Sequence, residues 1–288
     1  MNHRPWIIAH RGGGADFPEN TLLALKGAVE HRADMVWLSV QVSCDGVPVL
    51  YRPADLAALT EGSGKVADTP FRTLAALNAG FSFRDPAGEH PYRGVPIPLP
   101  SLEAALAAVP RAMPVILDMK TADPGATTDV LTALDGLEER GLPVWERCRF
   151  YCTERAPLTA VAAHPRARAF EARDRTRDRL AACRLTGECP SPPRSGSWVG
   201  FELHRDIELR ETCTLGEGVS TVEGATMWDE RTCACVRRHH RVTVVFFGIN
   251  TPADYLAAQR LGADAVLSDS PRQMERLTRQ GNRPEAFR

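Results

Sequence analysis

The stretch IIAHRGGGADFPENT, residues 7–21, carries most of the information about the fold of this chain. An apolar run ends in His10 and Arg11, three glycines follow, and the Pro-Glu-Asn-Thr segment has the residue types that begin a helix. The stretch therefore predicts a buried strand, a tight turn and a helix. Because side chains alternate along a strand, we expect His10 and Arg11 to point to opposite sides, with one of them at the end of the strand facing a site.

Length and charge limit the classes of protein that the chain can represent. Its 288 residues, 43% of them hydrophobic, suit one α/β barrel of roughly 250 residues or two small domains. The net charge of -1 does not steer the molecule to nucleic acid or to an anionic membrane. The longest apolar run, 242–248, is far shorter than the ~20 residues that span a bilayer. The N-terminal residues show no apolar signal-peptide core, so we expect a cytoplasmic protein.

Short β-rich runs alternate with Ala- and Leu-rich runs, and this alternation is typical of a parallel α/β sheet. It predicts a single domain, residues 1–288, with the α/β fold of a TIM (β/α)8 barrel. The predicted strands are 6–10, 34–42, 115–120, 148–153, 167–172, 197–203, 242–248 and 265–268. The predicted helices are 20–31, 101–109, 126–140, 155–164, 174–184, 229–239 and 251–261.

A β-hairpin and an insertion are predicted at the C-terminal face of the barrel. Only Cys-Asp-Gly at 44–46 separates two apolar runs, and Asp-Gly favours a tight turn between antiparallel strands. Centring the pairing on this turn places Arg52 roughly opposite Ser39 or Trp37, at the strand end where barrel enzymes carry their chemistry. The Gly- and Pro-dense segment 53–100 is too long for an ordinary loop and is expected to lie over the barrel mouth.

The eight cysteines are expected to be free thiols, because the chain is large and shows no secretory signal. Cys233, Cys235 and His239 allow two interpretations. Cys235 and His239 are one helical turn apart and could bind zinc, but the Cys-Ala-Cys spacing is shorter than structural zinc sites usually show. The alternative is a solvent-facing helix end without a metal.

Charged side chains at two strand ends are candidates for chemistry. Asp118 and Lys120 alternate along VILDMK and therefore face the same side, which indicates either a functional site or a structural ion pair. His10 is either a core histidine or a site residue. Glu19 is either a site residue or an ordinary acid at the positive end of a helix.

The ordered motifs AHRG, PENT, the Asp-Gly hairpin, PIPLPSLEAAL, ILDMK, FFGIN and GADAVLSDSP make the chain resemble the glycerophosphodiester phosphodiesterase family along nearly its whole length. The resemblance implies a TIM barrel that splits a phosphodiester with a divalent cation and two catalytic histidines. It implies that His10 is the first catalytic histidine and Arg11 the phosphate-binding arginine. Glu19 matches the acid of PENT, Asp118 a metal-binding carboxylate, and Lys120 the lysine that follows it.

The sequence departs from the family pattern at the residues that matter most for the metal. Where the family has Glu-Leu-Asp, this chain has Trp-Leu-Ser at 37–39, and where the family has His-Asp, it has Arg-Pro at 52–53. Phe247 replaces the tryptophan of the family's Trp-Thr-Val-Asn block. Asp118 alone remains of the three implied metal carboxylates, so we expect no tight Mg²⁺ or Ca²⁺ site and at most a weak remnant. No other cofactor is implied.

Two functions fit these substitutions. In the first, the protein is a metal-independent phosphodiesterase in which His10, Arg11, Arg52 and Lys120 meet in a net positive site. Arg52 then replaces the charge of the cation, as an arginine does in bacterial phosphatidylinositol-specific phospholipases C. His204 is the candidate for a second acid/base group, and the substrate is a small phosphodiester.

In the second, the protein is an inactive pseudoenzyme that binds a phosphorylated ligand or partner through the barrel mouth. Two other classes are disfavoured by the residues. An aldolase or isomerase needs a Schiff-base lysine or an intact carboxylate cluster, and Lys120 is the one lysine at a predicted strand end. The arginines of 173–179 alternate with acids and polar residues, which is typical of a solvated helix face and not of nucleic-acid binding.

Overall fold

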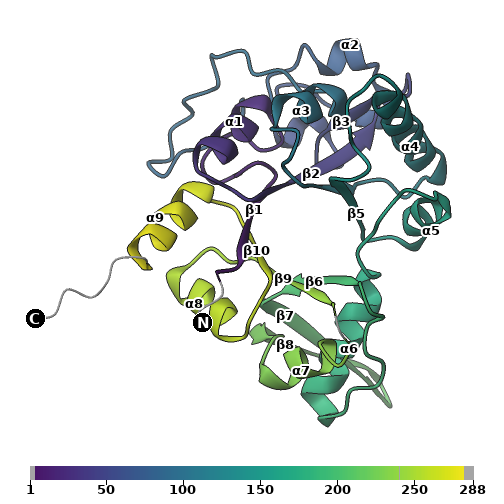
Figure 1. The fold of residues 1–288 in the computed structure, drawn as a ribbon, viewed down its shortest axis with the longest axis vertical. Helices are drawn as coiled ribbons and strands as arrows, with labels where there is room; N and C mark the ends of the chain where they lie inside the picture. The colour runs from purple at the N-terminus through teal and green to yellow at the C-terminus, as the bar shows by residue number, and fades with distance from the viewer. Residues whose placement is uncertain (1–3, 240, 282–288) are drawn as a thin grey trace, which may run out of the picture. The chain divides into compact units, whose positions relative to one another are not determined.

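The computed structural model describes residues 4–239 and 241–281, which form two compact units. The N-terminal unit contains residues 6–172 and 268–281, and the C-terminal unit contains residues 173–267 with residues 4–5. In both units parallel strands alternate with helices (Figure 1). The predicted single domain, 1–288, stays a prediction.

The sheet of the N-terminal unit holds the predicted site residues. Its parallel strands run in the order β5-β4-β2-β1, and β3 pairs antiparallel with β2. The strands are β1 (Trp6–His10), β2 (Met35–Val42), β3 (Pro48–Leu50), β4 (Val115–Met119) and β5 (Cys148–Cys152). The helices are α1 (Leu22–Glu30), α3 (Leu102–Ala108), α4 (Pro124–Glu139), α5 (Arg155–Ala163) and α9 (Pro271–Gly281).

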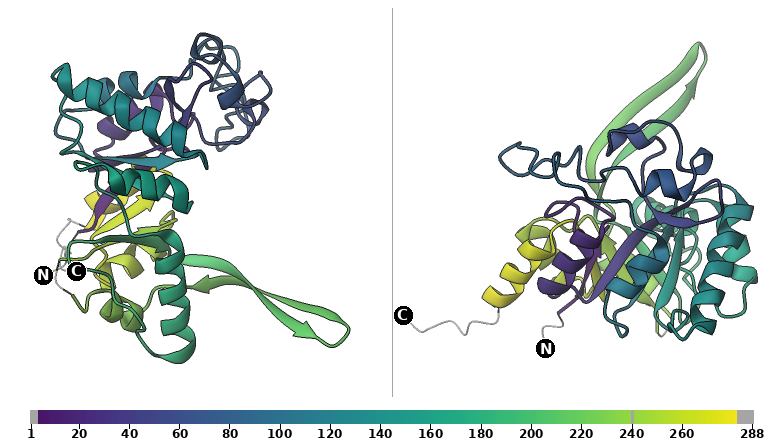
Figure 2. Two further views of the ribbon diagram at one scale, coloured as in Figure 1. Left: turned by 90° about the vertical axis from the view of Figure 1, so that its right-hand side faces the viewer. Right: turned by 90° about the horizontal axis from the view of Figure 1, so that it is seen from above.

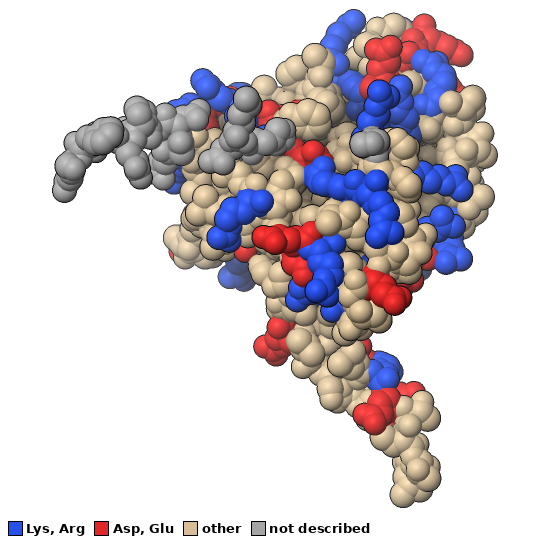
Figure 3. All heavy atoms as spheres, turned by 60° about the horizontal axis from the view of Figure 1, so that its bottom comes forward, with Lys and Arg blue, Asp and Glu red and all other residues tan. Residues whose placement is uncertain are grey.

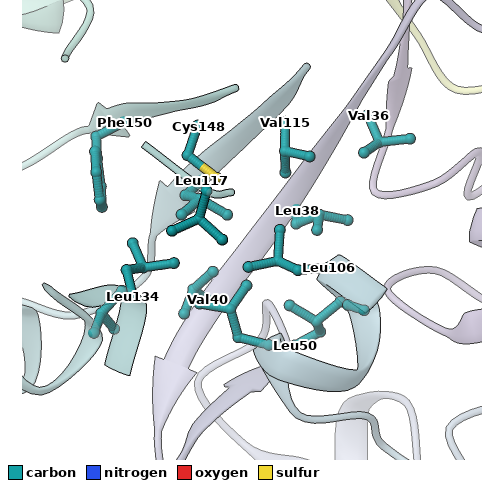
Figure 4. Close-up of a cluster of buried hydrophobic side chains, with 14 of the residues drawn as sticks. Val36, Leu38, Val40, Leu50, Leu106, Val115, Leu117, Leu134, Cys148 and Phe150 are labelled. Carbon is teal, nitrogen blue, oxygen red and sulfur yellow. The ribbon is translucent and has the colours of Figure 1, made fainter. Parts of the chain in front are cut away.

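The two faces of this sheet differ in chemistry. Alternate side chains of β2, β4 and β5 pack with α3 and α4 into a buried aliphatic core (Figure 4). Each fully buried Val or Leu of this kind stabilises the fold by about 1.5–3 kcal/mol. The remaining side chains, among them Trp37, Ser39, Asp118 and Tyr151, face the other way. The register places Ser39 beside Asp118 and Asp118 beside Tyr151, so the polar positions of neighbouring strands lie at one level.

The segment predicted as an insertion has a small core of its own. Tyr51, directly after β3, donates its hydroxyl to the carbonyls of Asp55 and Leu56 and holds the start of the insertion. Its short helices are η1 (Leu56–Ala58), η2 (Val66–Asp68) and α2 (Phe71–Leu74). The buried residues of this cluster are Val49, Tyr51, Leu56, Val66, Leu74, Ala79, Ile97 and Leu99.

The C-terminal unit contains a parallel sheet and a long hairpin. The parallel strands β6 (Trp198–Glu202), β9 (Thr243–Phe247) and β10 (Ala265–Ser268) run in the order β10-β9-β6. The helices are α6 (Arg173–Thr186), α7 (Glu230–Val236) and α8 (Pro252–Arg260). The antiparallel strands β7 (His204–Cys213) and β8 (Gly216–Thr226) form a two-stranded ribbon that projects from its unit (Figure 2).

The structure corrects some of the predicted elements. The strand predicted at 167–172 is wrong, because this segment forms only an isolated bridge from Ala169 to Phe150. The β7–β8 hairpin and α9 were not predicted. Of the helices in the described residues, none is long and apolar enough to cross a bilayer.

A disulfide joins Cys189 to Cys235, with their Cα atoms 5.5 Å apart. The prediction of free thiols is therefore wrong for these two residues, because the loop after α6 returns to α7. Cys235 is also not available to bind zinc with Cys233 and His239. Closing a loop of this length stabilises a protein by about 4 kcal/mol in the chain-entropy model. The cytoplasmic location that we expected from the sequence stays a prediction.

The remaining cysteines lead to a testable prediction. Cys44 and Cys213 are exposed, whereas burial raises the pKa of Cys148, Cys152 and Cys233 to about 12. A thiol with a raised pKa stays protonated and unreactive until the pH approaches that value. We expect a disulfide-exchange reagent to label two thiols rapidly in the folded protein between pH 7 and 9. Unfolding should raise the count to the six free cysteines, and prior reduction should raise it to eight. A count of eight in the unfolded, unreduced protein would contradict the disulfide.

Candidate functional site

The turn after β1 is shaped by close packing. Gly12 and Gly13 have φ values of +81° and +104°. A Cβ atom on Gly12 would lie 2.9 Å from the Cβ of Ala24, and one on Gly13 would lie 2.8 Å from the Cδ of Pro271. These glycines therefore allow α1 and the start of α9 to pack against the end of β1.

Arg11 has a left-handed backbone conformation, with a φ of +54°. This conformation is uncommon for a residue with a side chain and costs about 1–3 kcal/mol. It turns the guanidinium back toward the preceding residue, so that Nε donates to Nε2 of His10 over 3.3 Å. The expectation that His10 and Arg11 point to opposite sides is wrong, because the strand ends at His10 and alternation ends with it.

His10 is held by a carboxylate that the sequence interpretation did not assign. Its Nδ1 lies 2.7 Å from Oδ1 of Asp269, which follows β10. With Nδ1–H donating to Asp269, Nε2 is an acceptor, as the hydrogen bond from Arg11 requires. A histidine in this state can accept a proton. Asp269 lies in the motif GADAVLSDSP quoted above. Its position directly after a predicted barrel strand was the signal by which the sequence could have identified it as a site residue.

Glu19 is the partner of Arg11. Its Oε2 pairs with an Nη atom of the guanidinium, while Asp269 lies 4.0 Å from the other. Thr21, and not Glu19 or Asn20, caps α1 through its hydroxyl. Asn20 has a φ of +58° and accepts a hydrogen bond from the backbone N–H of Ser39. The PENT segment thus connects the turn after β1 to the middle of β2.

Trp37 fills the space beside His10. The His10 and Trp37 ring centroids are 6.2 Å apart in an edge-on arrangement, and Tyr151 and Phe170 contact the indole at 4.8 and 6.0 Å. The indole N–H donates to Oδ2 of Asp118 over 3.1 Å. Trp37 is almost completely buried, so it connects the His10 side of the site to the Asp118 side.

Asp118 and Lys120 face the same side, as predicted, and form an ion pair. Lys120 Nζ lies 2.8 Å from Oδ2 of the buried Asp118 carboxylate. Oδ2 therefore receives both the lysine and the Trp37 indole N–H, while Oδ1 has no hydrogen-bond partner.

Four buried polar atoms of the site, which is formed by residues 10–20, 37–39 and 118–120, lack a hydrogen-bond partner. They are Glu19 Oε1, Asn20 Nδ2, Ser39 Oγ and Asp118 Oδ1. An unpaired buried polar group costs about 1–3 kcal/mol, and more when it is charged. The residues are joined by the Asn20–Ser39 hydrogen bond and by the Ser39–Asp118 strand register.

Arg52 does not join this centre. The backbone N–H of Tyr51 donates to the carbonyl of Ser39, so Tyr51, and not Arg52, lies across from Ser39. The predicted register is thus wrong by one residue, and alternation turns Arg52 to the other face. Arg52 is exposed and forms no ion pair with any residue in the described part of the chain. Burial raises the pKa of Tyr51 to about 12, so a neutral phenol occupies the predicted place of the arginine.

The charged side chains of the site do not give it a net positive charge. Two cations, Arg11 and Lys120, face three carboxylates, Glu19, Asp118 and Asp269. With His10 neutral, the described site carries one net negative charge. The prediction of a net positive site is therefore wrong, because each cation already has a carboxylate partner.

His204 belongs to the C-terminal unit. It begins β7, its side chain is 46% exposed, and its Nε2 lies 3.2 Å from Oδ1 of Asp254. Its Nδ1 lies 3.3 Å from the hydroxyl of Thr226. Its predicted role beside the substrate stays a prediction.

The residues at the centre do not fit a divalent cation. Mg²⁺ and Ca²⁺ require several oxygen ligands. Trp37 offers an N–H donor to Asp118 in place of a carboxylate ligand, and Ser39 offers a hydroxyl in place of a second one. Among the described residues no group of three His, Cys, Asp or Glu side chains is arranged to hold a metal ion.

Comparison with known proteins identifies the family. Residues 10–139 match the model of the glycerophosphoryl diester phosphodiesterase family. The chain is 45% identical over 273 residues to protein Rv2277c of Mycobacterium tuberculosis, covering 93% of this chain and 87% of the relative. The crystal structure of the glycerophosphoryl diester phosphodiesterase domain of Rv2277c superposes with a TM-score of 0.88 at 41% identity, covering 96% of this chain and all of that one. The chain belongs to the glycerophosphoryl diester phosphodiesterase family.

More distant members of the family agree on the fold. A phosphodiesterase of Oleispira antarctica, solved with the product sn-glycerol-3-phosphate, superposes with a TM-score of 0.68 at 21% identity over 96% of this chain and 97% of that one. Glycerophosphodiester phosphodiesterase 1 of Rattus norvegicus is 42% identical over 77 residues, 27% of this chain and 23% of the relative. The α/β fold of TIM-barrel type, predicted from the alternation of strands and helices, is confirmed.

Proposed function

We propose that this protein is a phosphodiesterase of the glycerophosphoryl diester phosphodiesterase type that works without a divalent cation. The observation that carries the proposal is the His10–Asp269 pair at 2.7 Å, with Nε2 left as an acceptor. Trp37 supports the absence of a metal requirement, because it stands where the family has a metal-binding carboxylate and donates its indole N–H to Asp118. The substrate class is a small phosphodiester.

The proposed chemistry uses only residues of this chain. When Arg11 donates to the substrate phosphate instead, His10 Nε2 accepts a proton from the attacking water molecule, and the carboxylate of Asp269 stabilises the imidazolium that forms. Arg11 lies beside the same nitrogen and can donate to a phosphoryl oxygen that gains charge in the transition state. His204 is the proposed group that protonates the leaving alcohol.

The chelator test follows directly from this proposal. We expect hydrolysis of bis(p-nitrophenyl) phosphate at an unchanged rate after dialysis against EDTA, and no stimulation by added Mg²⁺ or Ca²⁺. The matched control is a family member with an intact Glu-Leu-Asp strand, whose activity should depend on the added cation. Loss of the activity of this chain on chelation, with recovery on adding the metal, would show that the metal-free proposal is wrong.

A second candidate function is favoured by the paired cations. Arg11 and Lys120 are each engaged with carboxylates, and Arg52 lies outside the site, so the compensation for a missing metal is incomplete. The alternative is a pseudoenzyme that binds a phosphorylated ligand. Titration calorimetry with sn-glycerol-3-phosphate, the product bound by the Oleispira relative, distinguishes the two, since binding without hydrolysis of any phosphodiester supports the pseudoenzyme.

A further inference from the structure

The β7–β8 hairpin is a two-stranded ribbon with open edges. Both strands are exposed along nearly their whole length, and at the base His204 is tied to Asp254. Leu209, Val219 and Val222 are about half exposed, and Leu215 at the tip is fully exposed. An isolated two-stranded hairpin is only marginally stable in water. A ribbon of this length with apolar side chains on its surface is therefore expected to pack against something.

The two edges of the ribbon differ in charge. The β7 edge carries five charged residues among ten, Arg205, Asp206, Glu208, Arg210 and Glu211. Charged side chains are a common means of preventing the edge of a sheet from pairing. The β8 edge carries two charged residues among eleven, Glu217 and Glu223, and its centre is Val-Ser-Thr-Val. The β8 edge is therefore the edge that can accept another strand.

The charge of the hairpin limits the partner. Residues 204–226 contain two arginines and five acids, a net charge of −3, while the rest of the chain has 33 basic and 31 acidic residues, a net charge of +2. An acidic ribbon is repelled by anionic lipid surfaces and by nucleic acid. Figure 3 shows the ribbon as the projection whose end is free of Lys, Arg, Asp and Glu on the visible face.

The β8 sequence is complementary to itself. When two identical strands pair antiparallel about a two-fold axis, one residue must lie opposite its own copy. With Thr221 at that position, Ser220 faces the second copy's Val222. Val219 then faces the copy's Glu223, where the bulge at 223–224 ends the regular pairing. No like charges face each other, and cross-strand Thr–Thr and β-branched pairs are favourable in sheets.

We infer that β8 is a self-association strand, through which two copies of this chain join their hairpins into one four-stranded antiparallel sheet. Pairing of about five residues, 219–223, buries little area compared with the roughly 1,200–2,000 Å² of stable interfaces, so the dimer is expected to be reversible and concentration-dependent. This inference is independent of the proposed phosphodiesterase activity.

Sedimentation over a concentration series tests the inference on the full chain. The wild type should shift from monomer to dimer mass, and Thr221→Lys, which places two ammonium groups opposite each other, should weaken association at least about tenfold. Thr212→Lys is the matched control, because it adds the same charge to the β7 edge and should leave association unchanged. Equal association of the Thr221→Lys protein would overturn the inference.

Cysteine cross-linking tests the proposed register. In a background with Cys44→Ser and Cys213→Ser, Thr221→Cys should form a disulfide-linked dimer on mild oxidation, since residues opposite each other in antiparallel strands have Cα atoms 4.5–5.5 Å apart. Thr212→Cys in the same background should stay monomeric. Self-association would be refuted if the wild type stayed monomeric at every concentration and Thr221→Cys formed no cross-link. The β8 edge would then bind a different partner.

Discussion

Replacement of His10 by alanine is expected to lower kcat for phosphodiester hydrolysis by about 10²–10⁴-fold, the range that one general acid–base group contributes. His10 is the one histidine that the described N-terminal unit places beside both the Arg11 guanidinium and a carboxylate. Its Nε2 is the atom that we propose takes the proton from the attacking water molecule. Steady-state kinetics with bis(p-nitrophenyl) phosphate measures the effect.

The control for this variant is His31→Ala. His31 is also half-buried and also paired with a carboxylate, Glu275 at 3.0 Å, but it lies at the end of α1, outside the site. Its replacement should reduce stability while leaving kcat close to that of the wild type. Equal activity of His10→Ala and the wild type would remove the proposed acid/base role and favour the binding protein.

Replacement of Asp269 by asparagine is expected to lower kcat by about 10²-fold or more with a small change in KM. The amide keeps the size of the side chain but cannot neutralise the imidazolium that forms when His10 takes a proton. It can also donate to Nδ1 and so favour the tautomer in which Nε2 carries the hydrogen. A lower kcat with little change in KM distinguishes this role of Asp269 from a role in substrate binding.

Asp16→Asn is the matched control for Asp269. Asp16 accepts hydrogen bonds from the Ser270 hydroxyl and from the backbone N–H of Arg272, so it anchors the same segment without touching His10. Its replacement should lower the melting temperature but retain kcat. If Asp269→Asn and Asp16→Asn lose activity in parallel with stability, Asp269 is only structural.

Local patterns in the sequence were sufficient for the framework of the site. The strands that carry His10 and Asp118 were predicted because apolar runs of four to eight residues with polar ends are distinctive. Alternation along the strand predicted that the Asp118 and Lys120 side chains face the same side, and the ion pair between them confirms this geometry. The fold class followed from the order of these elements.

The predicted side-chain directions were wrong where one backbone angle or one register position decides which way a side chain points. The positive φ of Arg11 turns its side chain away from the direction that strand alternation predicts. The residue type does not indicate that φ is positive here. At Arg52 a shift of one residue moved the side chain to the other face, which is the usual consequence of a register error in a strand.

Contacts between distant parts of the sequence could not be predicted from local patterns. Asp269 reaches His10 across 259 residues, and Cys189 reaches Cys235 across 46. The β7–β8 hairpin was not predicted, because it lacks an Asn-Gly or Asp-Gly turn. Each of these features depends on three-dimensional proximity and not on periodicity.

The packing of Trp37 makes a stepwise construction of a cation site costly. A glutamate introduced there alone would be a carboxylate enclosed by Tyr151 and Phe170, next to the charge of Asp118 and without the metal that would neutralise it. An aspartate at Ser39 alone would add a second buried acid beside Asp118. Each single substitution is therefore expected to lower stability, so a cation site at this position would need both carboxylates and the ion together.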